Sequence, residues 1–102
     1  MTVNIRGNAT EAIRSHIMER LGAALNQFET SVRKISVQLR DLNGPRGGED
    51  KSVQIQVVLA GTSPIVIEHR GHDLYAVISQ VADKVKNTAG RLLARRSNHR
   101  SR

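Results

Sequence analysis

The longest periodic stretch of the chain, from Asp73 to Arg96, reads DLYAVISQVADKVKNTAGRLLARR. Its apolar residues recur at steps of three and four, which is the pattern of a helix with one buried face. Asp73 precedes the stripe and is a short carboxylate suited to capping the helix N-terminus. The pattern predicts one long amphipathic helix against which the rest of the chain packs. The stripe consists of Leu74, Ile78, Val81, Val85, Ala89 and Leu92.

The net charge of the protein is concentrated in this last part of the chain. The 102 residues carry a formal charge of +7, and no acidic residue follows Asp83. The chain before residue 84 holds as many basic as acidic residues and is neutral. A polyanion would therefore meet the C-terminal helix first. The unopposed basic residues are Lys84, Lys86, Arg91, Arg95, Arg96, Arg100 and Arg102.

The segments before this helix supply the strands and one further helix. Apolar and polar residues alternate at residues 2–6, 34–40, 52–59 and 65–67, which is typical of strands with one buried face. Between the first two strands, apolar residues at helical spacing follow a capping residue, Thr10. That second stripe consists of Ile13, Ile17, Leu21, Ala24, Leu25 and Phe28.

The order strand, helix, strand, strand, strand, helix predicts an α+β fold. We expect a four-stranded mixed sheet with both helices packed on one face, because every strand has one apolar and one polar side. The first strand–helix–strand unit should make the first two strands parallel, and the later strands should follow as antiparallel hairpins. Residues 1–96 should form a single domain, with residues 97–102 as a basic, disordered tail.

Composition argues against several classes of function. There is no cysteine, which removes thiolate metal sites, and no apolar run approaches the ~20 residues of a membrane span. His69 and His72 lack a third metal ligand, and the glycine-rich loop from Gly44 to Gly48 lacks the Lys-Ser/Thr ending of a phosphate-binding P-loop. We predict a cytoplasmic protein that is not an enzyme and has no cofactor, no small-molecule substrate and no membrane contact.

The basic helix favours binding of nucleic acid through phosphates. Lys84, Arg91 and Arg95 are spaced seven and four residues apart and should lie on one side of the helix, with Lys86 and Arg96 at its flanks. Lys34 and Arg40, with Arg6, should widen this surface from the polar face of the sheet. The alternative is a solvated helix face with no ligand. Tyr75 most simply packs against the sheet edge, so a platform that stacks successive bases is a poor fit, and folded RNA fits better.

Two stretches and the order of the elements resemble the ribosome hibernation promoting factor family, which includes the ribosome-associated translation inhibitors and the sigma-54 modulation proteins. The first stretch is Val3-Asn-Ile-Arg-Gly-Asn8 followed by Thr10-Glu-Ala-Ile-Arg14. The second is Gly71-His-Asp-Leu-Tyr-Ala-Val-Ile78 followed by Asp83-Lys84-Val85. The resemblance covers residues 1–96.

This resemblance implies a fold like that of double-stranded-RNA-binding domains and a factor that inhibits translation under stress. Such factors bind the rRNA of the small ribosomal subunit in the channel of mRNA and tRNA. Lys84 matches the family's lysine after aspartate, Arg91 and Arg95 fall where lysines are common, and Arg20 keeps a base of the first helix. The chain ends after this domain, so we expect a separate factor to pair ribosomes.

Two other functions remain open at this point. A protein-interaction module would use Leu92, Leu93 and the apolar stripe of the long helix to dock on a partner. A general double-stranded-RNA binder of the same fold would have no role on the ribosome and would bind plain duplexes tightly. Neutralising Lys84, Arg91 and Arg95 separates RNA binding from protein docking.

Overall fold

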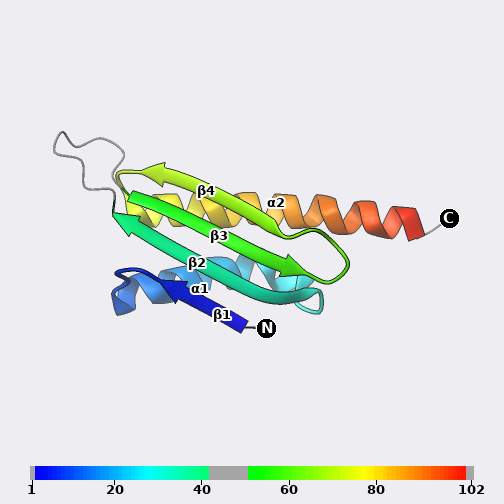
Figure 1. Ribbon diagram of the computed structural model, residues 1–102, viewed down its shortest axis with the longest axis horizontal. Helices are drawn as coiled ribbons and strands as arrows, with labels where there is room; N and C mark the ends of the chain where they lie inside the picture. The colour runs from blue at the N-terminus through cyan, green and yellow to red at the C-terminus, as the bar shows by residue number, and fades with distance from the viewer. Residues whose placement is uncertain (1, 42–50, 101–102) are drawn as a thin grey trace.

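The computed structural model describes residues 2–41 and 51–100 and has the predicted order of elements (Figure 1). The glycine-rich loop from Gly44 to Gly48, which the sequence distinguishes from a phosphate-binding P-loop, lies outside these residues. A short 3₁₀ helix, η1, follows the first helix. The elements are β1 (Thr2–Arg6), α1 (Glu11–Leu25), η1 (Asn26–Phe28), β2 (Val32–Asp41), β3 (Lys51–Leu59), β4 (Ile65–Gly71) and α2 (Leu74–Arg100).

The four strands form one mixed sheet in the order β1-β2-β3-β4. β1 pairs with β2 in parallel, with Val3 opposite Ile35, and the two remaining pairs are antiparallel. Val37 lies opposite Ile55, and Ile55 in turn lies opposite Ile67, so the apolar positions of neighbouring strands share one face. The α+β fold and the parallel first pair predicted from the sequence are confirmed.

Both helices cover the apolar face of the sheet, and Figure 1 shows them side by side behind the strands. Ile17 of α1 and Val85 of α2 are almost fully buried against strand residues such as Ile55 and Val57. Burying one such aliphatic side chain contributes about 1.5–3 kcal/mol, and this core is built almost wholly of them. The other face of the sheet is left uncovered, and we call it the open face.

Caps and one glycine define where the helices begin. The Thr10 hydroxyl accepts a hydrogen bond from the Ile13 N–H (3.2 Å), and the Asp73 carboxylate accepts one from the Tyr75 N–H (3.0 Å). Gly7, between β1 and α1, has a φ of +106°. A Cβ there would lie 2.3 Å from the carbonyl oxygen of Leu39. Glycine is therefore required where the chain turns from β1 towards α1.

Three boundaries differ from the prediction. α1 ends at Leu25, so Phe28 lies in η1 and packs next to Gly90 of α2 rather than continuing the helical stripe. β2 begins at Val32, with an irregularity in its pairing between Val32 and Lys34. α2 continues to Arg100, whereas the sequence predicts a tail from Ser97. The single domain of residues 1–96 and the disorder of the tail stay predictions.

Candidate nucleic-acid interface

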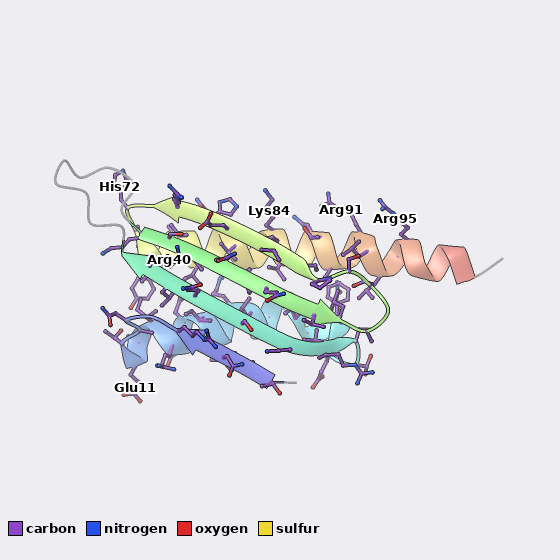
Figure 2. All side chains as sticks on the ribbon, viewed as in Figure 1. Glu11, Arg40, His72, Lys84, Arg91 and Arg95 are labelled. Atoms are coloured by element: carbon purple, nitrogen blue, oxygen red, sulfur yellow. The ribbon has the colours of Figure 1, made fainter. Side chains whose placement is uncertain are left out.

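The orientation of α2 about its axis decides which of its cations share a surface. Val81, Val85 and Ala89 are buried in the core and hold this face of the helix against the sheet. With about 100° of rotation per residue, positions 84, 91 and 95 fall on one flank of the helix. Lys84, Arg91 and Arg95 are all exposed, and Figure 2 shows their side chains pointing to the same side, away from α1. We call these three residues the basic row.

The basic row is long enough to meet several phosphates. Lys84 and Arg95 are eleven positions apart, or about 16 Å along the helix axis, whereas each strand of a duplex presents a phosphate every ~3.4 Å of axis. Arg91 donates a weak hydrogen bond from Nη2 to Thr88 Oγ1 (3.5 Å). This exposed, long contact leaves most of the guanidinium donors available to a ligand.

Lys86 does not lie on the same side as the basic row. It follows Ser79 by seven residues and therefore lies on the flank of α2 that faces α1, where Ser79 and Tyr75 contact His16. Arg20 is four residues after His16 and lies on the facing flank of α1, half-buried. Arg20 and Lys86 thus lie on the sides of α1 and α2 that face each other. The prediction that Lys86 flanks the basic row is wrong, because positions 84 and 86 are separated by about 200° of rotation around the helix axis. The side chain of Arg96 lies outside the described part.

Lys34 and Arg40 lie on a third surface, the open face of the sheet. Both are exposed and alternate along β2 with Ile35, Val37 and Leu39, which are buried on the helix side. The sheet itself separates these two cations from the helices. The residues singled out in the sequence therefore form three groups on one molecule: the basic row, the pair on the facing sides of α1 and α2, and the two cations of β2.

Contacts of Tyr75 and His16 were missed in the sequence. The two rings meet edge to face, with centroids 4.8 Å apart and planes at 63°. The His16 Nε2 also lies 3.2 Å from the Tyr75 carbonyl oxygen. Tyr75 packs on α1, so its predicted place at the sheet edge is wrong. No local sequence pattern indicates this contact, because His16 and Tyr75 are 59 residues apart in the chain and meet only when the two helices pack together.

The described residues offer no arrangement typical of a metal or membrane site. His69 is half-buried on β4 and His72 is exposed after it. Among residues 2–41 and 51–100, no group of three or more His, Cys, Asp or Glu side chains could hold a metal ion. Within the same ranges, no helix has the length and apolar character needed to cross a membrane.

Solved structures share this fold. The N-terminal domain of Thermus thermophilus Protein Y superimposes with a TM-score of 0.68 at 25% identity, covering 88% of this chain and 93% of that one. A ribosomal subunit interface protein from Coxiella burnetii gives a TM-score of 0.71 at 16% identity, covering 89% and 96% of the two chains. No curated protein matches the chain significantly.

The βαβββα order, with two helices on one face of a four-stranded sheet, places the chain in a class of small α+β domains similar to these two structures. Residues 2–97 match the family described as sigma 54 modulation protein / S30EA ribosomal protein. The chain belongs to this family. The resemblance drawn from the Asp73-Leu-Tyr-Ala76 segment and the order of elements is thereby confirmed.

Proposed function

We propose that this protein is a ribosome-associated factor that silences translation by binding rRNA of the small subunit in the channel of mRNA and tRNA. The observation that carries the proposal is the basic row. Lys84, Arg91 and Arg95 point the same way from one exposed flank of a helix whose opposite side is anchored in the core. A rigid element presenting three cations in a line suits a polyanionic backbone.

Family membership supports the ribosome as the target. The family description names a ribosomal protein, and one neighbouring structure is that of a ribosomal subunit interface protein. The small subunit and its rRNA as the particular partner are our inference from the sequence resemblance. From the same resemblance we infer that the protein is cytoplasmic.

The proposed mechanism is steric occupation of the channel combined with neutralisation of phosphate charge. Arginine meets a phosphate with two parallel hydrogen bonds and lysine meets it as a point charge, and neither contact reads base sequence. The protein needs no reaction or cofactor for this role. Arg20 and Lys86, which lie on the facing sides of α1 and α2, would add contacts where RNA passes over both helices.

The apolar end of α2 argues against a protein-docking module as the main function. Leu92 and Leu93 are half-buried and pack against the core of this same chain. They therefore do not extend as a free apolar surface for a partner. A general double-stranded-RNA binder stays an alternative, because the basic row makes contacts that any RNA backbone satisfies.

Sedimentation of purified ribosomes with the protein in sucrose gradients tests the proposal. We expect the protein to migrate with the small subunit and the whole ribosome at low salt and to dissociate at high salt, since released counterions drive phosphate binding. The variant Lys84→Gln/Arg91→Gln/Arg95→Gln should stay at the top of the gradient. Wild-type protein that stays at the top at low salt would refute ribosome association. Equal affinity for a plain RNA duplex would favour the general binder.

A further inference from the structure

The open face of the sheet carries a second set of polar groups, ordered by strand pairing. Register places Asn4, Ser36 and Gln56 in one row across β1, β2 and β3. The next row contains Arg6, Gln38, Gln54 and Glu68, and the row after it contains Arg40, Ser52 and Arg70. Side chains that lie opposite each other on neighbouring strands are about 4.5–5.5 Å apart, so these groups form a largely polar surface. The exposed Val66 continues the first row on β4, and Ser52 is buried within the third.

This surface is hollowed at its centre. A shallow cavity of about 360 Å³ opens on the uncovered side of the sheet. That volume falls in the lower part of the range of ~300–1,000 Å³ that accommodates small organic ligands. Mostly polar side chains form the lining, which contains Asn4, Arg6, Lys34, Ser36, Val37, Gln38, Gln54, Gln56 and Val66.

The charged side chains of the open face are mostly positive. Arg6, Lys34, Arg40 and Arg70 are exposed at its open positions on β1, β2 and β4. Within the described residues, Glu68 is the single carboxylate at the open positions of the paired strands, and it accepts a hydrogen bond from Ser52 Oγ (3.1 Å). The cations surround a neutral centre of amides, which makes the face complementary to a polyanion.

The amides select the kind of polyanion. Asparagine and glutamine side chains each offer two donors and one acceptor group, which match the free edges of unpaired bases. In an RNA duplex the Watson–Crick edges pair with each other, and the major groove is too deep and narrow for side chains to read, so an unpaired strand is the better match. No aromatic side chain lies among the lining residues, so recognition by stacking is absent from this cavity.

We propose that the open face of the sheet binds an unpaired RNA strand, with its bases towards the central amides and its phosphates towards the surrounding cations. This deepens the proposed function and rests on it for the choice of RNA. Lys34 and Arg40 then contact RNA on the open face of the sheet, whereas the basic row contacts it from α2, on the opposite side of the sheet. The molecule would hold RNA on two surfaces at once.

An isosteric substitution tests this directly. Gln56→Glu keeps the shape of an exposed side chain on the central strand β3 and adds one negative charge beside the cavity. Gln27→Glu makes the same chemical change at an exposed position of η1, away from the open face, and is the matched control. Both variants change net charge equally, so a difference between them reports the location of the bound strand.

The assay is fluorescence anisotropy with a labelled, unstructured CA-repeat RNA of about 12 nucleotides at low salt, within the range of single-strand site sizes. We expect Gln56→Glu to weaken binding by roughly threefold to tenfold, the effect of one unit charge about 6 Å from a phosphate at an effective dielectric constant of roughly 40–80. Gln27→Glu should leave the dissociation constant within about twofold of wild type. Thermal melting of both variants confirms that they fold.

Three results would overturn the proposal: no binding of the RNA by wild-type protein, equal binding by wild type and Gln56→Glu, or equal weakening by both substitutions. The proposed function fails separately, when wild-type protein does not sediment with ribosomes. An effect of Gln56→Glu without ribosome binding would support the open face as an RNA site and reject the ribosome role. Ribosome binding by wild-type protein, together with an unchanged oligonucleotide affinity of Gln56→Glu, would support the ribosome role and reject the open face as an RNA site.

Discussion

Glutamine at positions 84, 91 and 95 removes the three charges of the basic row and keeps a polar side chain at each position. These side chains are exposed on α2, and none belongs to the core. We therefore expect the free energy of unfolding to change by less than about 0.5 kcal/mol. A loss of ribosome or RNA binding in this variant is then electrostatic in origin rather than a consequence of unfolding.

The size of the loss follows from the number of phosphates that the row meets. Each neutralised phosphate contributes about −0.9 to the slope of log affinity against log salt for duplex and about −0.7 for single strands. If each of the three cations meets one phosphate, the slope becomes shallower by about 2.1 to 2.7 in the variant. Between about 50 and about 200 mM salt, wild-type affinity should fall roughly 20- to 40-fold more than that of the variant.

Titration of purified small subunits by co-sedimentation at four salt concentrations measures both slopes. Arg91→Gln and Arg14→Gln form a matched pair, because each removes one exposed arginine from a helix. Arg14 lies near the start of α1, away from the basic row. We expect Arg91→Gln to change the slope by about 0.7–0.9 and Arg14→Gln to leave it unchanged. An unchanged slope in the triple variant, or equal changes in the matched pair, would refute this role of the basic row.

Further predictions concern the scaffold and are checked by urea denaturation. Gly7→Ala should destabilise the protein by at least about 1–3 kcal/mol, because its φ of +106° is strained for alanine and its Cβ would overlap Leu39; a neutral result would contradict the turn geometry. Gly22→Ala should stabilise by about 0.4–1 kcal/mol, because it lies within α1 and its Cβ would meet nothing within 4 Å; destabilisation would mean that this face of α1 is covered. Val85→Ala should cost about 1–3 kcal/mol, since Val85 is fully buried between helix and sheet, and a loss below about 0.5 kcal/mol would contradict that packing.

Local patterns in the sequence were sufficient for most of the fold. The period of 3.6 in α2 and the period of 2 in β2 and β3 assigned Val81, Val85 and Ile55 to the core, where the structure has them. Thr10 and Asp73 begin their helices as predicted. Such signals are readable because capping and amphipathic burial involve residues close to one another in the chain.

Local sequence patterns predicted the arrangement of the candidate site residues less completely than they predicted the fold. The grouping of Lys84, Arg91 and Arg95 followed from helix periodicity alone and agrees with their placement in Figure 2. Helix periodicity alone separates Lys86 from this row, because positions 84 and 86 differ by about 200° around the helix axis. That its side of α2 faces α1, however, is decided by the packing of the two helices, which no local pattern contains. The same holds for Tyr75, whose ring meets that of His16, and for Ser52, which is 2% exposed and hydrogen-bonded to Glu68 on the neighbouring strand.

By itself, the sequence determined the order and type of the elements, the residues of the core and the concentration of charge on the last helix. Tertiary structure alone decided that the predicted cations separate into three surfaces and that cations of β1, β2 and β4 gather around the amides of the open face. The reason is physical. Periodicity is a property of neighbouring residues, whereas strand register and helix–helix placement arise from hydrogen bonds and packing between segments far apart in the chain.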